Sequence, residues 1–371
     1  MTARKTIVVT GAEGFVGKNL MLRLQEEDGF EPVPLSRASS EGDWNDAVSR
    51  AFAVIHLAGV NRPQSDEEFR GNRTAADALI SAIEHAQREV PVLLASSVKA
   101  VEPTAYGTSK KDAEEALLAF ARRKGNPVAI FRLPNLFGKW CKPNYNSAVA
   151  TFCHNIARDM PVTVHDPAAP LSLLYVDDLV DTFLALLNGD GIETGYHEAA
   201  PVYETSVGEV AEKIRGFRED RATNLIDNVG EGLTRALYAT FVSYLPLDEF
   251  SYELKSHRDP RGAFSEMLKT REAGQFSYFN ALPGVTRGGH YHHTKTEKFL
   301  IVHGEALFRF RHMLTGETQE IRTSADTPVV VETIPGWAHD VTNVGETIMV
   351  SLLWANEIFD RERPDTIAAR V

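Results

Sequence analysis

Two groups of residues in this chain of 371 residues have the types and spacing that catalysis requires. In the first group, Tyr106 and Lys110 are four residues apart at the start of a predicted helix, and Ser97 precedes them. One helical turn separates the tyrosine from the lysine, so both side chains can face the same side. A nearby ammonium stabilises tyrosinate and lowers the pKa of the phenol, so that Tyr106 can exchange a proton with a substrate oxygen. Ser97 would hold that oxygen.

The second group consists of two histidines and a glutamate in the last third of the chain: His290, His292 and Glu297. His290 and His292 alternate on a predicted strand, so both side chains point to the same face. Imidazoles and a carboxylate together suit a borderline divalent ion such as zinc, manganese, iron or nickel. The sequence predicts a divalent metal site, with zinc as the expected ion. The alternative is a set of structural histidines that bind no metal.

A glycine-rich loop, Gly11-x-x-Gly14-x-x-Gly17, follows a predicted strand and opens a predicted helix that begins with Phe15 and Val16. Glycines in this context permit a tight turn and let a pyrophosphate approach the N–H groups at the helix N-terminus. The loop predicts a dinucleotide site.

The residues after the second predicted strand favour NADPH over NADH. NAD-binding proteins tend to place an acid here for the ribose 2′-hydroxyl, whereas an arginine accommodates the 2′-phosphate of NADP. This chain has Arg37 and no acid until Glu41. The alternative is that Arg37 is only a solvated loop residue.

The elements that must position these groups divide the chain in two. The first part alternates strands with helices, which predicts a parallel sheet with helices on both faces. Its strands are expected near residues 7–9, 31–35, 54–57, 92–95 and 128–131, and its helices near 15–26, 73–87 and 110–124. After about residue 245, short β-prone runs broken by Gly, Pro and Asn predict a small antiparallel barrel or jelly roll. We expect domains at 1–243 and 244–371.

Composition excludes several functional classes. The net charge of −12 argues against nonspecific binding to nucleic acid or anionic membranes. No signal-peptide pattern and no apolar run of membrane-spanning length are present. Cys141 and Cys153 are too few for a disulfide framework, so a cytoplasmic protein is expected.

The first part resembles the extended, nucleotide-sugar-modifying branch of the short-chain dehydrogenase/reductase superfamily over roughly residues 5–240. Besides the glycine loop and the Tyr-Lys pair, the similar segments are residues 56–59, Asn72, 132–138 and 174–178. The resemblance implies an NAD(P)-binding Rossmann domain in which Tyr106 is the acid/base, Lys110 tunes it and Ser97 orients the carbonyl. It also implies cofactor contacts from Ala58, Gly59, Asn72 and Leu133, and a substrate contact from Asn135.

Two features depart from that branch. The connection between Ser97 and Tyr106 is short, and Leu171 stands where an arginine often contacts the nucleotide diphosphate. Lys139 and Lys142 are candidates to replace that arginine, although both also suit a solvated loop.

The last part resembles the cupins, because residues 284–304 match the first cupin motif and residues 335–343 resemble the second. This resemblance implies that His339 supplies the last metal ligand beside His290, His292 and Glu297. His293 does not match the ligand pattern and should point away from the barrel interior. Residues 259–266 and 287–292 are similar to segments of nucleotide-sugar 3,5-epimerases. That resemblance implies nucleotide or sugar contacts from Arg261 and Glu266, and a cation, Lys298, near the developing enolate.

The two resemblances disagree about His290. In the cupins its position is a metal ligand, whereas in the 3,5-epimerases it is the base that removes a proton beside a 4-ketone. An imidazole nitrogen bound to a metal cannot also be the base. The sequence leaves both alternatives open.

The Tyr106–Lys110 group and the histidine–glutamate group both require a sugar that carries a 4-ketone. A 4-ketone makes the C3 and C5 protons of a sugar acidic, and a reductase that consumes the ketone locks the configuration. The whole chain resembles the bifunctional capsular-polysaccharide enzymes of the CapF (WbjC) type. This implies C3 epimerisation of a UDP-2-acetamido-2,6-dideoxy-4-hexulose, then reduction by NADPH to UDP-N-acetyl-6-deoxy-L-talosamine, in a homodimer. The alternative is a dTDP- or GDP-4-keto-6-deoxysugar reductase whose cupin domain only dimerises or binds sugar.

Overall fold

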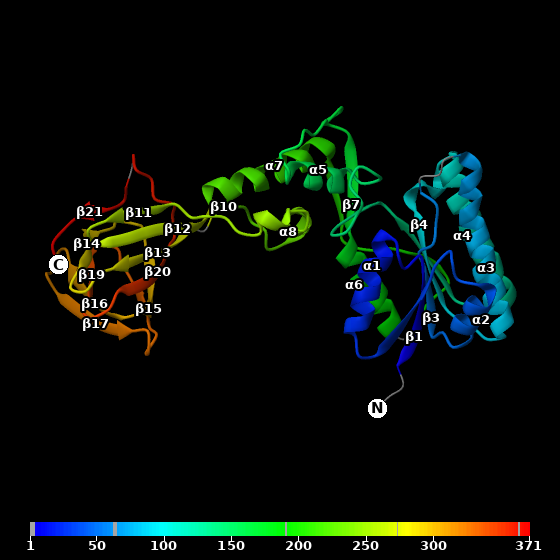
Figure 1. The fold of residues 1–371 in the computed structure, drawn as a ribbon, viewed down its shortest axis with the longest axis horizontal. Helices are drawn as coiled ribbons and strands as arrows, with labels where there is room; N and C mark the ends of the chain where they lie inside the picture. Colours follow the sequence, from blue (N-terminus) through cyan, green and yellow to red (C-terminus); the bar gives the residue numbers. More distant parts are fainter. Residues whose placement is uncertain (1–3, 62–64, 190, 273, 363) are drawn as a thin grey trace. The chain divides into compact units, whose positions relative to one another are not determined.

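The computed structural model describes residues 4–61, 65–189, 191–272, 274–362 and 364–371. The chain forms two compact units (Figure 1). The first comprises Met1–Arg215 and Arg235–Leu245, and the second comprises Gly216–Thr234 and Pro246–Val371. No helix in the described residues is long and apolar enough to cross a membrane.

The first unit is built on a parallel sheet of six strands in the order β2-β1-β3-β4-β5-β8. Continuous apolar runs such as Ile7, Val8 and Val9 are fully buried because helices cover both faces. The strands are β1 (Lys5–Thr10), β2 (Phe30–Leu35), β3 (Ala53–His56), β4 (Val92–Ser97), β5 (Val128–Leu133) and β8 (Gly195–His197).

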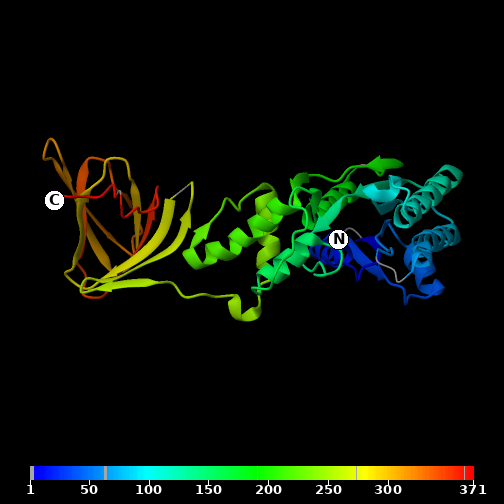
Figure 2. The ribbon, with the colours of Figure 1, turned by 90° about the horizontal axis from the view of Figure 1, so that it is seen from above.

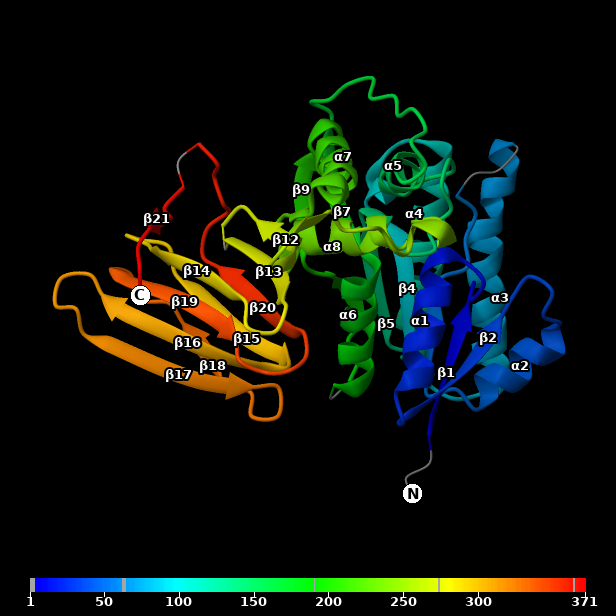
Figure 3. The same ribbon diagram turned by 60° about the vertical axis from the view of Figure 1, so that its left-hand side comes forward.

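Two separate apolar cores lie on the two faces of this sheet (Figure 3). Helices α1 (Phe15–Glu26) and α6 (Val176–Asn188) supply one core. The other core is supplied by α2 (Glu41–Ser49), α3 (Arg70–Ala86) and α4 (Ala105–Lys124). The Rossmann architecture expected from the strand–helix alternation is confirmed. The order reverses at β1, which lies between β2 and β3, and ligands of open α/β sheets bind at such a switch point.

The remainder of the first unit carries a small three-stranded sheet, β6-β7-β9, and further helices. These elements are β6 (Asn135–Phe137), α5 (Ala148–Ile156), β7 (Pro170–Tyr175), β9 (Val202–Ser206), α7 (Val207–Thr223) and α8 (Gly232–Val242). Helix α7 continues into the second unit, where β10 (Leu225–Ile226) pairs with β12.

Beyond the end of α7 and the start of α8, the second unit is built from two β-sheets (Figures 1 and 2). One sheet has the order β10-β12-β13-β20-β15-β18, with β11 paired to β12, and the other has the order β17-β16-β19-β14-β21. The strands are β11 (Ser256–Asp259), β12 (Gly262–Thr270), β13 (Gly274–Ala281), β14 (Thr286–Tyr291), β15 (Glu297–His303), β16 (Glu305–His312), β17 (Thr318–Ser324), β18 (Val330–Glu332), β19 (Trp337–Asn343), β20 (Met349–Ala355) and β21 (Ile367–Ala368).

Aromatic side chains from both sheets form one core between them. Phe299 of β15 and Phe308 of β16 meet edge-on at 5.5 Å between ring centroids. The cupin-like jelly roll expected for this part is confirmed.

Candidate active sites

The glycine loop at the end of β1 has no room for side chains. Gly11 has a φ of +70°, and a Cβ there would lie 2.8 Å from the Ala58 nitrogen. A Cβ on Gly17 would lie 2.3 Å from the carbonyl oxygen of Gly11. Gly14 caps α1 without a side-chain hydrogen bond, so the N–H groups of the first turn, which Phe15 and Val16 begin, are open to a phosphate. The loop therefore fits the pyrophosphate of a dinucleotide.

Arg37 lies just beyond β2, at the edge where the ribose is expected. Its side chain is exposed, and its guanidinium makes no hydrogen bond or ion pair with the residues that the structure describes. This placement leaves it available to a 2′-phosphate.

Gly59 lies against helix α4, which carries Tyr106 and Lys110. Asn72 connects the loop at residues 58–60 to the same helix. The buried Asn72 amide accepts a hydrogen bond from the Val60 nitrogen at 2.8 Å and donates one to Ser109 Oγ at 2.9 Å. A Cβ on Gly59 would lie 2.9 Å from Asn72 Oδ1 and 3.1 Å from Lys110 Nζ. The Ala58–Gly59 loop and Asn72 therefore border the space occupied by the lysine.

The structure brings Ser97, Tyr106 and Lys110 together. Thr104 caps α4 by accepting a hydrogen bond from the Gly107 nitrogen at 3.0 Å, which starts the helix just before Tyr106. A Cβ on Gly107 would lie 2.3 Å from the carbonyl oxygen of Lys99, so glycine permits close approach of the segment that follows Ser97. The Lys110 ammonium is buried, 6.0 Å from the centre of the Tyr106 ring.

The electrostatics of this site differ from the sequence prediction of a lowered phenol pKa. Burial raises the pKa of Tyr106, and its hydrogen bond with Ser97 only partly opposes this. Burial also lowers the pKa of Lys110 to about 8, while the negative charge of Glu114 acts in the opposite direction. A raised pKa keeps the Tyr106 phenol protonated at neutral pH, which is the form that can donate a proton during a reduction.

Sequence reasoning missed a buried polar network behind this site. The Glu114 carboxylate accepts hydrogen bonds from Ser96 Oγ at 2.5 Å, Arg132 Nη2 at 2.7 Å and the Tyr196 hydroxyl at 3.1 Å. Glu114 lies one helical turn beyond Lys110, and Ser96 adjoins Ser97. An acidic residue on the buried side of α4 is the signal that could have identified it, since buried carboxylates need partners.

Leu133, an expected cofactor contact, and Asn135, an expected substrate contact, lie at and beyond the end of β5, and the two candidate diphosphate lysines follow them. Leu133 is buried, whereas Asn135 is exposed and donates a hydrogen bond from Nδ2 to the Ser172 carbonyl at 3.2 Å. The Lys139 ammonium pairs with Asp177 at 2.5 Å, and Lys142 lies 5.3 Å from the centre of the Tyr145 ring.

In the second unit, the four expected metal ligands form one cluster. One ligand atom from each of His290, His292, Glu297 and His339 lies within 4.8 Å of the others. His290 pairs with His339 across β14 and β19. The β-bulge at Gly288 and Gly289, both with positive φ, sets this register.

The hydrogen bonds of two histidines turn their Nε2 atoms toward the cluster. Since a carbonyl oxygen can only accept, Nδ1 of His292 donates to the Asp365 carbonyl and Nδ1 of His339 donates to the Trp337 carbonyl. Their Nε2 atoms lie 3.3 and 3.6 Å from Glu297 Oε2. Nε2 of His339 is buried and has no hydrogen-bond partner in the described structure. This orphaned nitrogen, with the mixed N/O donor set, fits a divalent ion.

Charge at the cluster also suits a metal. Burial opposes ionisation of Glu297, but the nearby imidazoles of His292 and His339 and the Lys295 ammonium outweigh it and lower the pKa. Burial lowers the pKa of His290 to about 4, with a smaller effect of His339. At neutral pH the carboxylate is therefore ionised and His290 is neutral.

The structure places Lys298 away from this cluster and Lys295 beside it. Lys298 is exposed and pairs with Glu332, because it follows the inward-facing Glu297 on the same strand and so points to the opposite face. Lys295 is 6% exposed, and its ammonium lies 3.7 Å from Glu297 Oε1. Strand alternation could have excluded Lys298, but it could not indicate Lys295, which lies in the loop between β14 and β15. His293 is exposed, as expected.

The expected substrate contacts of the second unit both lie on the β11–β12 hairpin. Arg261 is exposed and pairs with Asp259 at 2.6 Å. Glu266 pairs across β12 and β13 with Ser277, on the same face as the core residue Phe279. Arg287, which the expected set omitted, is half-buried with its guanidinium 5.1 Å from the Phe279 ring centre.

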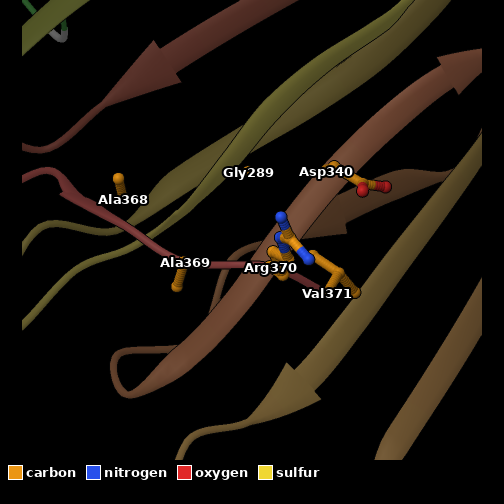
Figure 4. Close-up of a pocket in the computed structure, with 6 residues that line it drawn as sticks. All are labelled: Gly289, Asp340, Ala368, Ala369, Arg370 and Val371. Carbon is orange, nitrogen blue, oxygen red and sulfur yellow. The ribbon is translucent and has the colours of Figure 1, made fainter.

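A shallow groove of about 540 Å³ lies beside the C-terminal residues of the chain (Figure 4). Asp340 lines it, together with Gly289 and the last four residues of the chain. Because Asp340 follows His339 on β19, its side chain points to the opposite face. The groove is therefore separate from the histidine cluster.

Comparisons with known proteins agree with this division. Residues 7–196 match the NAD dependent epimerase/dehydratase family, and residues 257–367 match the polysaccharide biosynthesis C-terminal domain. The chain is 52% identical to the UDP-2-acetamido-2,6-beta-L-arabino-hexul-4-ose reductase of Pseudomonas aeruginosa, over 98% of each chain.

Solved structures give the same relationship. The capsular polysaccharide assembling protein CapF from Staphylococcus aureus superposes with a TM-score of 0.91 at 40% identity, over 98% of this chain and all of that one. The UDP-N-acetylglucosamine 4-epimerase from Bacillus cereus shares only the fold, with a TM-score of 0.56 at 20% identity over 68% of this chain and 99% of that one.

Proposed function

The chain belongs to the NAD dependent epimerase/dehydratase family as a CapF-like member, and on this basis we propose that it is a bifunctional nucleotide-sugar enzyme. Its second domain epimerises C3 of a UDP-2-acetamido-2,6-dideoxy-4-hexulose. Its first domain then reduces the C4 ketone with NADPH to UDP-N-acetyl-6-deoxy-L-talosamine, on a route to UDP-N-acetyl-L-fucosamine for capsule or O-antigen. We assign the epimerase activity to residues 244–371 and the reductase activity to residues 1–243.

The observation that carries the reductase assignment is the convergence of Ser97, Tyr106 and Lys110 beside the glycine loop. Its relative of 52% identity is named as a reductase of a UDP-linked 4-hexulose. When bound, NADPH supplies the hydride that C4 accepts. The residues that would hold it are the glycine loop, Arg37, the Ala58–Gly59 loop, Asn72 and Leu133.

The side chains of the first unit move the proton. Ser97 donates a hydrogen bond to the C4 carbonyl oxygen and orients it, and Tyr106 donates its phenolic proton as negative charge develops on that oxygen. Lys110 stabilises the tyrosinate that remains. Asn135 contacts the sugar.

The epimerase assignment rests on the donor cluster in the second unit. His290, His292, Glu297 and His339 would hold a divalent ion, with zinc as the proposed ion. A metal bound there supplies Lewis-acid stabilisation of the charge on the oxygen beside the acidic C–H. Arg261 and Glu266 contact the nucleotide-sugar. We place His290 among the ligands and leave the base unassigned.

Deuterium exchange without NADPH tests the two-site function. The protein is incubated with the UDP-4-keto sugar in D₂O, and deuterium at C3 is measured by NMR. We expect exchange at C3, because epimerisation removes and returns that proton. Absence of exchange, with NADPH oxidation intact, would instead make the second domain a non-catalytic dimerisation or sugar-binding module of a UDP-, dTDP- or GDP-4-keto-6-deoxysugar reductase. We also propose a homodimer, which light scattering would test.

A further inference from the structure

The last residues of the chain bind the loop that carries two of the clustered donors. The Asp365 carboxylate accepts hydrogen bonds from the backbone nitrogens of His293, Thr294 and Lys295 at 2.9, 2.7 and 2.9 Å. It also accepts one from Thr294 Oγ1 at 3.1 Å. A single side chain thus satisfies three successive N–H groups between His292 and Glu297, although it lies some seventy residues away in sequence.

The same segment also orients two donor side chains of the cluster. The Asp365 carbonyl accepts the Nδ1 proton of His292, which leaves Nε2 to face Glu297. Thr366 Oγ1 accepts a hydrogen bond from Lys295 Nζ at 3.0 Å, and this ammonium in turn pairs with Glu297 Oε1. Ligand-orienting hydrogen bonds of this kind set both the tautomer and the direction of a donor.

A third connection reaches β14, the strand that carries His290. Strand β21 pairs with β14, with Ala368 opposite His290 and Ile367 opposite Tyr291. The Ala369 nitrogen donates to the Gly289 carbonyl at 2.9 Å. The C-terminal segment, defined as residues 364–371, therefore contacts the supports of His290, His292 and Glu297.

We propose that the C-terminal segment is a structural part of the divalent-metal site, so that its docking and metal binding stabilise each other. The proposal rests on the metal binding proposed above. Coupling of this kind is reciprocal: if the docked segment raises metal affinity, the metal must stabilise docking by the same factor. Asp365 is a positioning residue in this scheme, since it acts through His292 and the 293–295 backbone.

The first test is zinc affinity in two matched variants, measured by competition with a chromophoric chelator. Asp365→Ala removes the carboxylate and should weaken Zn²⁺ binding by about 10- to 100-fold, the usual cost of losing an outer-shell partner. Asp360→Ala removes the same charge from the same region, where the carboxylate accepts only the Glu362 N–H among the described residues. This control should bind Zn²⁺ like the wild type. Equal affinity in all three proteins would overturn the coupling.

The second test needs no variant, so a folding defect cannot obscure it. Hydrogen exchange of the wild-type protein is followed by mass spectrometry with Zn²⁺ and after chelation. The amides of residues 365–371, including that of Ala369, should exchange more slowly with the metal bound. Unchanged exchange in a protein that binds one equivalent of Zn²⁺ would overturn the coupling alone. A wild-type protein that binds no Zn²⁺ would overturn both this coupling and the proposed metal site.

Discussion

Replacing Glu114 by glutamine should change both the stability and the pH dependence of the reductase. The Glu114 side chain is 1% exposed and receives hydrogen bonds from Ser96, Arg132 and Tyr196. Glutamine keeps the shape and one acceptor oxygen but removes the charge. Its NH₂ group must then face groups that also donate.

The stability cost follows from the ion pair with Arg132. Removing one partner of a buried pair costs roughly 3–5 kcal/mol. The Arg132 side chain is 30% exposed and can regain water, so we expect the low end, about 3 kcal/mol. For a domain of this size each kcal/mol lowers Tm by about 2–4 °C, which predicts a decrease of about 6–12 °C.

The effect on catalysis passes through Lys110. Burial lowers its pKa to about 8, so the ammonium that supports Tyr106 is present at pH 7 and lost as the pH rises through 8. For a single group, this predicts a reduction rate about tenfold lower at pH 9 than at pH 7. The charge of Glu114 raises the pKa of Lys110. In Glu114→Gln the alkaline decrease must therefore begin at lower pH.

The assay is kcat for NADPH oxidation with the 4-keto sugar between pH 6 and pH 10. Glu115→Gln is the matched control, because Glu115 is the next residue of α4, is exposed and pairs only loosely with Lys111 at 3.8 Å. The control should keep the wild-type profile. If the alkaline decrease of Glu114→Gln coincided with that of Glu115→Gln, Glu114 would not tune Lys110 and our reasoning would be refuted.

Two further predictions separate the sites. Tyr106→Phe should lower NADPH oxidation by roughly 10²- to 10⁴-fold, the contribution of a positioned acid, while deuterium exchange at C3 persists. Loss of both activities in a folded Tyr106→Phe protein would contradict two independent sites. His292→Ala should reduce bound metal, measured by elemental analysis, whereas the exposed His293→Ala keeps it. Equal metal content in these two variants would rule out His292 as a ligand.

Local patterns in the sequence predicted the parts of the site that local geometry determines. The glycine loop, the predicted helix 15–26 and the Tyr106–Lys110 spacing depend on neighbouring residues, and the structure places them as expected. Helix α4 begins at Ala105, which agrees with a helix start at Tyr106, whereas the helical pattern alone covered only residues 110–124 because the Thr104 cap precedes it.

Predictions that depended on contacts between residues far apart in the sequence were wrong or were not made. The Tyr106 pKa depends on burial by other elements, so the Tyr-Lys spacing alone gave the wrong direction. No local pattern could join Asp365 to the 293–295 backbone, because the contact spans about seventy residues. Lys298 is different: its alternation with Glu297 already implied the outer face.

Under the proposed function, the two chemistries impose an order that the first unit must enforce. Reduction of the 4-ketone removes the acidity of the C3 proton, so a sugar reduced before epimerisation can no longer be epimerised. The second unit alone cannot prevent premature reduction. The substrate and the product of epimerisation both carry the 4-ketone, whose oxygen Tyr106 protonates. Discrimination at C3 must therefore occur where the first unit holds the sugar, near Ser97 and Asn135. The reductase should accordingly show a lower kcat/KM for the unepimerised ketone than for its C3 epimer.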